Sequence, residues 1–329
     1  MNRLFVFLGK KQQEGGGPST FLRRLKEYSP TNIVFKNINY INKNSLERKL
    51  IFLLPKTYDL SFYFYIFSKK YPIILRLDGS SLINPGRYSL NIITKALLSD
   101  FLTVIYIIFA DHVVFQSIYT KNVWNFAISF LKKSNSIIYN PSPSILTGYY
   151  NDTRKTKAKK INIICLEGSV QKYLAERILK SINNKYRVDI YGKVSQSLKN
   201  KFIKNNNVFF NGYINQEAIF SKIKEIPYVF ICLEKNPPCP NSVLEMLSLG
   251  VPVIGLNSGS LGELIGKAGI LIDPNEIYLD TFASVLNNCL SQIENSYLDY
   301  QELTLKRSLL FKEKYTLKKY LELFEKYSR

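Results

Sequence analysis

Short apolar runs alternate with longer amphipathic stretches along the 329 residues of the chain. Apolar runs of roughly four to eight residues bounded by turn residues are typical of strands buried in a parallel sheet, and the stretches between them are typical of crossover helices. The predicted strands are Leu4–Leu8, Asn32–Phe35, Leu50–Leu54, Ile73–Leu77, His112–Phe115, Ser136–Tyr139, Ile161–Leu166, Arg187–Tyr191, Val208–Asn211, Val229–Leu233, Pro252–Leu256 and Ile270–Ile272. The predicted helices are Ser19–Tyr28, Leu60–Lys69, Leu90–Phe109, Thr120–Leu131, Lys172–Ile182, Gln216–Ile223, Ser242–Leu249 and Leu261–Gly266, followed by a helical region from Leu279 to Tyr327. This order predicts an α/β fold with mainly parallel sheets.

A polar segment with prolines divides this pattern into two halves. It begins with Asn140–Ser144 and continues to Asn151–Lys157, a composition typical of linkers. We therefore predict an amino-terminal domain over residues 1–157 and a carboxy-terminal domain over residues 158–329, with the last helix able to pack back on the first domain. Ligands of such folds bind beyond the carboxyl ends of the strands, so functional residues are expected in the loops that follow strands, beside a cleft between the domains.

The charge of the chain is positive and uneven. The sequence has 45 Lys and Arg against 25 Asp and Glu, a net charge of +20, and residues 1–158 alone hold 22 basic and 8 acidic side chains. Two interpretations stay open. A basic half fits an acidic partner such as phosphate groups, nucleic acid or an anionic membrane, and it also fits a lysine-rich composition that keeps the protein in solution.

Cysteine and histidine usage argues against metal and disulfide sites. The four cysteines form no Cys-x-x-Cys pair, and His112 is the single histidine. Zinc sites need several such ligands at short spacing, and no Asp-x-Asp pair is present to hold Mg²⁺ or Mn²⁺. We expect a cytoplasmic protein without metal or disulfides.

Three apolar segments of the sequence bear on whether the protein enters or contacts a membrane. The start, Met1–Leu8, lacks a cleavage pattern and is expected to be the first strand, not a signal peptide. Ala96–Phe115 contains Asp100 and Asp111, which membrane-spanning helices rarely carry. The aromatic stretch Tyr58–Tyr71 fits a buried helix, and it also fits a helix lying in the membrane interface.

A glycine-rich loop follows the first predicted strand. Gly15, Gly16 and Gly17 precede Ser19 and Thr20, either of which could cap the next helix. Glycines let a backbone approach a ligand closely, and helix amino termini favour anions. The spacing matches neither the dinucleotide fingerprint nor the P-loop, so a phosphate-binding loop and a plain turn both stay open.

A second loop, after the predicted strand Val229–Leu233, leads into a helix. Pro240 ends the loop, Asn241 or Ser242 is expected to cap the helix, and Glu245 is expected in its first turn. Structurally, Glu245 would interact favourably with the helix dipole. Functionally, a carboxylate beside exposed N–H groups can bind the hydroxyls of a sugar while the N–H groups face phosphate.

This second segment and others in the chain together resemble one family. The resemblance is carried by Pro237–Ile254, by the glycine loop, by Ala110–Ser117, by the Asn140-Pro141 turn, by Gly192, by Val208–Tyr213, by Gly259–Ile265 and by Gly269–Ile272. In this order they resemble the motifs of family 4 glycosyltransferases over nearly the whole chain. The resemblance implies the GT-B fold, in which two Rossmann-like domains have a cleft between them, with a carboxy-terminal helical region. It also implies retaining transfer from a nucleotide sugar, which is a co-substrate, without a further cofactor or a metal.

The resemblance also implies which residues form the site. The residues expected to contact the donor are Gly15, Gly16, Gly17, Gly168, Ser169, Lys172, Pro240, Asn241, Ser242 and Glu245. Lys172 would supply a positive charge for the diphosphate, although a solvated lysine fits the sequence equally. The catalytic candidates are Asp78 and Glu234.

Several positions depart from the family pattern. Pro237 stands where the family has the first of two carboxylates, and Glu234 lies three residues earlier. The arginine expected near Lys172 is missing. Asp78 follows a strand where the family often has a histidine, so it could orient or deprotonate an acceptor hydroxyl, or it could serve only in an Asx-turn. His112 is expected to be a buried, hydrogen-bonded core residue.

The positive charge of the amino-terminal half indicates which kind of acceptor is expected. In this fold that half binds the acceptor, and its charge suits a lipid-linked glycan at an anionic membrane surface, as in O-antigen or capsule assembly. We therefore expect a peripheral protein at the inner face of the cell membrane that has no nucleic-acid partner. Two other classes stay open, namely a weakened or non-catalytic protein that binds nucleotide sugars, and a sugar-nucleotide epimerase.

Overall fold

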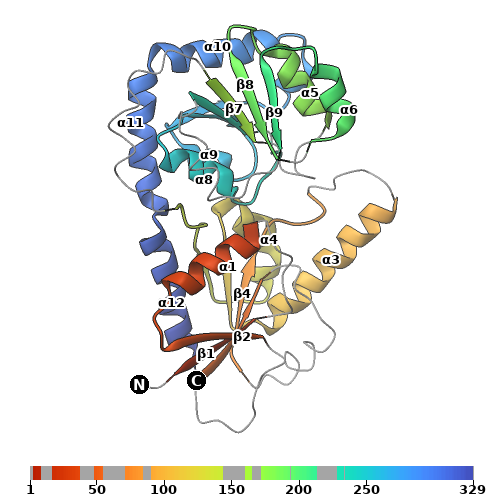
Figure 1. Ribbon diagram of the computed structural model, residues 1–329. Coiled ribbons are helices and arrows are strands. Elements are labelled where there is room, and N and C mark those ends of the chain that lie inside the picture. The colour runs from red at the N-terminus through yellow and green to blue at the C-terminus, as the bar shows by residue number, and fades with distance from the viewer. Residues whose placement is uncertain are drawn as a thin grey trace. The chain divides into compact units, whose positions relative to one another are not determined.

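The chain folds into two compact units, each built on one parallel sheet (Figure 1). The computed structural model describes residues 3–8, 17–37, 48–54, 71–83, 90–143, 160–164, 172–192, 194–212, 228–232 and 234–328. Unit 1 comprises Met1–Pro141 and Glu313–Arg329, and unit 2 comprises Ser142–Lys312. The division falls at Pro141, whereas the expected boundary at residue 157 lies outside the described residues, as do the predicted helices Leu60–Lys69 and Gln216–Ile223.

Unit 1 has a six-stranded sheet in which every described strand pair is parallel. Its strands are β1 (Leu4–Leu8), β2 (Ile33–Asn37), β3 (Arg48–Leu53), β4 (Ile73–Leu77), β5 (His112–Phe115) and β6 (Asn135–Ile137), in the order β2-β1-β3-β4-β5-β6. Its described helices are α1 (Gly17–Tyr28), α3 (Leu90–Phe109), α4 (Ile118–Phe130) and α12 (Glu313–Tyr327). The final helix of the chain therefore belongs to unit 1.

Alternating side chains of the strands build two cores, one on each face of this sheet. Leu4 and Val6 of β1 belong to the core that contains side chains of α1 and α12. Phe5 and Phe7 belong to the core that contains side chains of α3 and α4. Because successive side chains of a strand point to opposite faces, a strand covered by helices on both faces is apolar at nearly every position, as β1 is.

Unit 2 repeats this architecture with a second parallel sheet. Its strands are β7 (Lys160–Ile164), β8 (Arg187–Tyr191), β9 (Val208–Gly212), β10 (Val229–Cys232), β11 (Val253–Leu256) and β12 (Gly269–Ile272), in the order β12-β11-β10-β7-β8-β9. Its described helices are α5 (Lys172–Ser181), α6 (Gln196–Phe202), α8 (Asn241–Ser248), α9 (Leu261–Ile265), α10 (Phe282–Asn295) and α11 (Tyr297–Ser308), with short 3-10 turns η4 (Glu276–Tyr278) and η5 (Leu309–Phe311). The expected α/β fold with parallel sheets is confirmed.

The strand order identifies the position in each sheet where a ligand is expected. In unit 2, the chain builds outward from β7 in one direction, to β8 and β9, and then from β10 in the other direction, to β11 and β12. This is the Rossmann order, and its switch point lies between β7 and β10. In unit 1 the corresponding switch point lies between β1 and β3. Ligands of open parallel sheets bind at the carboxyl ends of the strands beside such a point.

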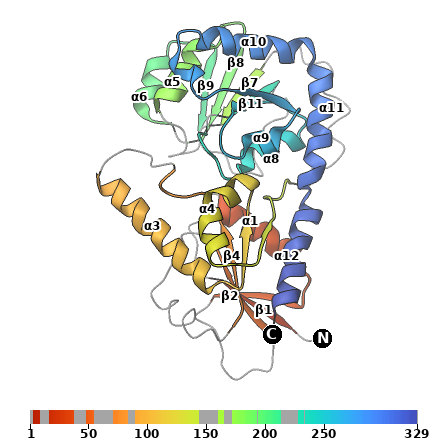
Figure 2. The same cartoon turned by 180° about the vertical axis from the view of Figure 1, so that it is seen from behind.

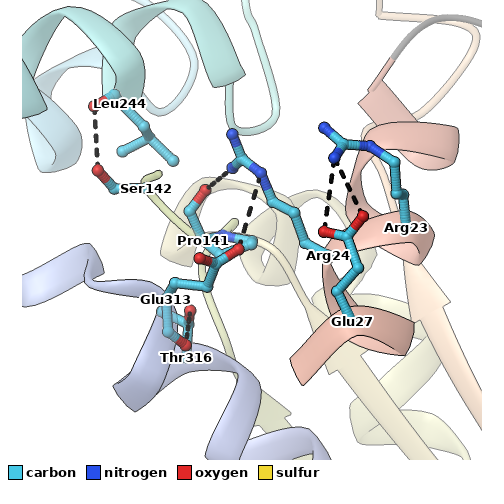
Figure 3. Close-up of polar contacts among 8 residues, drawn as sticks. All are labelled: Arg23, Arg24, Glu27, Pro141, Ser142, Leu244, Glu313 and Thr316. Atoms are coloured by element: carbon cyan, nitrogen blue, oxygen red, sulfur yellow. Dashed lines mark hydrogen bonds and ion pairs between the residues drawn. The ribbon is translucent and has the colours of Figure 1, made fainter. Parts of the chain in front are cut away.

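The chain passes from one unit to the other after Pro141 and again after Lys312, and polar contacts bind the residues beside these two points (Figure 3). In unit 1, the buried side chain of Arg24 donates a hydrogen bond to the carbonyl of Pro141, and its Nε lies 3.8 Å from Oε1 of Glu313. In unit 2, the backbone N–H of Ser142 donates to the carbonyl of Phe311 at 2.7 Å, and the Ser142 hydroxyl donates to the carbonyl of Leu244 at 3.4 Å. In each unit, contacts within that unit thus bind the chain segments that lead to the other unit.

His112 lies inside unit 1, with 4% of its surface exposed. Its Nδ1 is 2.9 Å from the hydroxyl of Ser134 and its Nε2 is 2.9 Å from that of Ser136, while the hydroxyl of Tyr327 lies 3.2 Å from Nδ1. Burial, together with the charge of Lys326, lowers the pKa of His112 from 6.5 to about 4. The prediction of a buried, hydrogen-bonded core histidine is confirmed.

This histidine makes the stability of unit 1 depend on pH. The folded chain keeps His112 neutral, whereas the unfolded chain binds a proton with an ordinary pKa, so stability is lost as the pH falls from above 6.5 towards about 4. We expect the free energy of unfolding to fall by about 2 kcal/mol between about pH 7 and pH 5. Denaturant titration of the wild type and of His112→Gln measures this loss.

The variant His112→Gln keeps a polar side chain beside the two serines but cannot gain a charge. Because His112 is the single histidine of the chain, the variant is expected to lose most of the pH dependence in this window. An equal loss of stability in both proteins would contradict the assignment.

Candidate functional site

The loop between β10 and α8 lies at the switch point of unit 2. Its described residues run from Glu234 to Pro240, and the side chains of Pro237, Cys239 and Pro240 are buried. A loop with three buried side chains is packed against the unit, so the loop presents α8 from a defined position. The predicted site segment is thus found at the place where the topology alone expects a ligand.

A second loop, after β11, holds the first one in place. The hydroxyl of Ser258 accepts a hydrogen bond from the N–H of Asn236 at 3.1 Å, and the N–H of Ser260 donates to the carbonyl of Pro237 at 2.9 Å. Between them, Gly259 has φ +60°, and a Cβ there would lie 2.5 Å from the carbonyl carbon of Asn236. The two loops meet so closely that only glycine fits at this position.

Helix α8 begins one residue earlier than predicted and without the predicted cap. Pro240 is the N-cap, with φ −70° and ψ 122°, and it makes no side-chain cap hydrogen bond. Asn241 and Ser242 are therefore the first two helical residues and not caps. Because proline offers no side-chain acceptor, no capping side chain from the N-cap position covers the N–H groups of the first turn, which helix geometry leaves without intrahelical acceptors.

Glu245 is the fifth residue of α8, so the expectation that it lies in the first turn is wrong. The cause is the earlier start of the helix, which moves Glu245 into the second turn and rules out a capping box. Only 6% of Glu245 is exposed, and Ser242 is buried with 8% exposed. A buried glutamate needs a specific partner, because desolvation of an unpaired carboxylate is costly.

Glu234, a catalytic candidate, lies directly after β10 and is half-buried. Burial and the negative charge of Glu234 raise the pKa of the Cys232 thiol, which stays protonated. Between Glu234 and Pro237, Asn236 adopts φ +53°, so the chain turns sharply between the two positions. Whether Glu234 serves where the family has a carboxylate at the position of Pro237 stays a prediction.

Three further donor candidates follow β7 in the sequence, and β7 is the other strand beside the switch point. Gly168 and Ser169 fall outside the described residues. Lys172 is the first residue of α5, and its side chain also falls outside the described part of the chain. The segment that follows β7 and the loop that follows β10 nevertheless come after adjacent strands, because β7 pairs with β10.

In unit 1, the glycine-rich segment follows β1 in the sequence, and β1 is one of the two strands beside the switch point of that sheet. Gly15 and Gly16 fall outside the described residues, and Gly17 is the first residue of α1. The expectation that Ser19 or Thr20 caps this helix is wrong, because both lie inside it. Pro18 in the first turn explains the early start, since its ring fits helical φ and its missing N–H would have no acceptor there.

Asp78 lies just beyond the carboxyl end of β4, beside a buried arginine. Its carboxylate is 3.8 Å from NH1 of Arg76, and its backbone carbonyl accepts a hydrogen bond from the indole N–H of Trp124 at 3.1 Å. The side chain of Asp78 is 28% exposed. The carboxylate is thus oriented by a fixed cation and is still accessible to a ligand.

Sequence reasoning missed two features of these sites. Arg76 is 1% exposed, yet the only signal for it was a charge inside the apolar run Ile73–Leu77. The contacts of Ser258 and Ser260 with the β10–α8 loop had no local signal, because they depend on how two loops meet in space. Gly259 alone could have indicated them, as a glycine between two serines after a strand.

A model of one protein family matches part of the chain. Residues 167–292 match the family model described as Glycosyl transferases group 1. This region includes the β10–α8 loop, Glu245 and Gly259. No curated protein matches the sequence.

Solved structures match the chain at low identity. A sucrose-phosphate synthase from Thermosynechococcus elongatus is 12% identical, with a TM-score of 0.73 over 98% of both chains. The HepE protein of Anabaena, in complex with UDP and glucose, is 14% identical, with a TM-score of 0.66 over 98% of this chain and 99% of that one. The pneumococcal O-GlcNAc transferase GtfA, in complex with UDP and GlcNAc, is 15% identical, with a TM-score of 0.66 over 84% of this chain. This chain spans 56% of the length of GtfA.

The chain has the GT-B fold of these structures, and its residues 167–292 are those that match the glycosyl transferases of group 1.

Proposed function

We propose that this chain is a retaining glycosyltransferase, of the family 4 type, that moves a sugar from a nucleotide-sugar donor to an acceptor hydroxyl. The observation that carries the proposal is the β10–α8 segment. It lies at the switch point of unit 2, it presents a helix amino terminus without a side-chain cap, and it lies inside the match to glycosyl transferases of group 1. Two structural neighbours, HepE and GtfA, were solved with UDP, which supports a nucleotide sugar as the donor.

The chemistry follows from these groups. The bond between the anomeric carbon and the terminal phosphate oxygen of the donor breaks, and the acceptor oxygen bonds to that carbon on the face from which the phosphate left. The nucleotide diphosphate departs with the electron pair of the broken bond, and an oxygen of this departing diphosphate takes up the proton that the acceptor hydroxyl loses. N–H groups at the start of α8 suit the negative charge that grows on the departing diphosphate. Glu245 suits a role in binding the sugar hydroxyls.

On the acceptor side, we assign Asp78 to orienting the acceptor hydroxyl. A carboxylate that is fixed by Arg76 and still partly exposed can accept a hydrogen bond from that hydroxyl. The basic amino-terminal half supports a lipid-linked glycan as acceptor, presented at the inner face of the cell membrane during assembly of a cell-surface polysaccharide. None of the helices in the described part of the chain combines the length and the apolar character that crossing a bilayer requires.

Calorimetry with a panel of UDP and GDP sugars tests the donor site. One donor is expected to bind, and Glu245→Gln is expected to weaken it by about ten- to a hundredfold, because a charge-assisted hydrogen bond to the sugar becomes a neutral one. Glu302→Gln is the matched control. Glu302 is exposed on α11 and is paired with Lys306, so its substitution is expected to leave donor affinity unchanged.

Two other outcomes have different meanings. Binding without transfer to an extracted lipid-linked glycan would favour a non-catalytic protein, which the proline at position 237 would explain. Absence of binding for every donor, with a cooperative unfolding transition intact, would contradict the proposed function.

A further inference from the structure

The segment that follows β4 begins with the aspartate assigned to the acceptor. We call residues 78–83 the β4 segment. Two hydrogen bonds to backbone carbonyls fix its start: the side-chain amide of Gln116 donates to Leu77 at 3.3 Å, and the indole of Trp124 donates to Asp78 at 3.1 Å. None of the residues 78–83 is buried, so little apolar packing holds the segment and its position depends on hydrogen bonds.

One carboxylate on α3 holds the middle of the β4 segment. Oδ1 of Asp100 accepts a hydrogen bond from the backbone N–H of Ser81 at 2.8 Å, and Oδ2 accepts one from the N–H of Leu82 at 3.2 Å. Oδ2 also accepts a hydrogen bond from the hydroxyl of Ser80. Three successive residues of the segment thus direct a donor at the same carboxylate, and hydrogen bonds to a carboxylate are stronger than neutral ones.

The helix that carries Asp100 gives no reason of its own for an aspartate at this position. Asp100 is the single acidic residue of α3, most of whose other residues are apolar, and aspartate is a poor helix former. Helix α3 packs against β4 and α4 (Figure 2), so a side chain on it is able to reach the segment that follows β4. The hydrogen bonds to the β4 segment therefore account for the charge within this helix.

We propose that Asp100 is a positioning residue of the acceptor site. The bond from Trp124 fixes the start of the β4 segment and Asp100 fixes its middle, so the backbone on both sides of the Asp78 carboxylate is held. This carboxylate then keeps its place 3.8 Å from NH1 of Arg76 before an acceptor binds. A group that is ordered in advance orients a hydroxyl at a lower entropic cost. The inference rests on the proposed function, because it depends on the assignment of Asp78 to the acceptor.

Transfer kinetics of Asp100→Asn test this role. The amide keeps the shape of the side chain but has one acceptor oxygen in place of two, so it loses at least one of the bonds to the segment. With a lipid-linked glycan extract as the varied substrate, kcat/KM is expected to fall about tenfold or more. The affinity for the nucleotide sugar, measured by calorimetry, is expected to stay unchanged, because Asp100 lies in unit 1 and the donor candidate Glu245 lies in unit 2.

The matched control is an aspartate that binds the other end of β4. The carboxylate of Asp111 accepts a hydrogen bond from the N–H of Ile73, the first residue of β4, at 2.8 Å. Asp111→Asn makes the same chemical change at the end of the strand away from Asp78. It is expected to destabilise unit 1 in denaturant, as Asp100→Asn does, and to leave kcat/KM unchanged. An equal loss of transfer in both variants would overturn the assignment, because a weakened fold would then explain it.

Trp124 provides a second readout that does not depend on activity. It is the single tryptophan of the chain, and its hydrogen bond to the carbonyl of Asp78 makes its fluorescence sensitive to the start of the β4 segment. Acrylamide is expected to quench this fluorescence more strongly in Asp100→Asn than in the wild type, and equally in Asp111→Asn and the wild type. Unchanged quenching in Asp100→Asn would overturn the assignment.

The failure of this inference differs from the failure of the proposed function. A wild type that binds no nucleotide sugar and transfers none would refute the proposed function, and the role of Asp100 with it. A wild type that transfers sugar, together with an Asp100→Asn variant that transfers it equally well, would overturn the role of Asp100 alone.

Discussion

Gly259→Ala is expected to destabilise unit 2 by about 3 kcal/mol or more and to weaken donor binding at the same time. Two costs add at this position. The backbone has φ +60°, which an alanine adopts only with about 1–2 kcal/mol of strain. The new methyl group would also overlap the backbone of Asn236 and Pro237, so the β10–α8 loop would have to move. Denaturant unfolding measures the first effect, and calorimetry with the donor measures the second.

Gly212→Ala isolates the backbone cost. Gly212, at the end of β9 in the same unit, has φ +71°, and a Cβ there would meet nothing within 4 Å. We expect this variant to lose only about 1–2 kcal/mol and to bind the donor normally. If the two variants were equally destabilised, the contact between the loops would contribute little. If Gly259→Ala unfolded more easily yet bound the donor normally, the loop would not need its present position for binding.

The strands of this protein were predictable because both sheets are covered by helices. Ile73–Leu77, His112–Phe115 and Arg187–Tyr191 were predicted with the bounds that the structure has. A strand that is buried on both faces reads as a continuous apolar run between turn residues, and this signal is local. The parallel arrangement then follows from the alternation of strands and helices.

The errors in the helices have physical reasons that no local pattern carries. Helix α6 was not predicted, because it has seven residues and buries only Leu198 and Phe202. The helical region after Leu279 is divided at Ser296 and again at Leu309–Lys312, although no glycine or proline marks either break. These breaks depend on packing, as where α11 lies against α8.

The candidate site was predictable in position but not in detail. The sequence places Glu245 and Asn241 after a buried strand, and the topology puts that strand at the switch point of unit 2. The helix start was misjudged because serine and asparagine are stronger caps than proline, and the structure nevertheless uses Pro240. A proline at the N-cap position has no side-chain acceptor, so this helix begins without a side-chain cap hydrogen bond.

Arg76, in β4, contacts four residues from different parts of unit 1. Its side chain is 1% exposed and lies over the ring of Phe21 of α1, 4.1 Å from the centroid. Its Nε donates to the hydroxyl of Tyr320 of α12 at 3.2 Å, and NH2 donates to Oδ1 of Asn140. Its NH1 has no hydrogen-bond partner and faces the carboxylate of Asp78 at 3.8 Å. One buried cation thus connects α1, α12, Asn140 and the candidate catalytic aspartate.

We expect Arg76→Met to lower the free energy of unfolding of unit 1 by about 3 kcal/mol. Methionine keeps the apolar stem but removes two hydrogen bonds from buried acceptors, each worth about 1–3 kcal/mol, and the contact with Phe21. Part of this loss is offset, because the variant no longer buries a guanidinium whose NH1 has no hydrogen bond. Denaturant unfolding, followed by a probe in unit 1 such as the fluorescence of Trp124, measures the difference.

Arg23→Met is the matched control on α1. Arg23 is exposed and pairs with Glu27 four residues along the helix (Figure 3), so its loss is expected to change stability by no more than about 0.5 kcal/mol. A neutral or stabilising Arg76→Met would contradict the structural role, because the desolvation of the cation would then outweigh its hydrogen bonds. The arginine would in that case be costly to the fold, and its proximity to Asp78 would be the remaining physical reason to bury a charge in this strand. Transfer measured with Arg76→Met would then decide the point, since a positioning role predicts a lower kcat with an unchanged affinity for the donor.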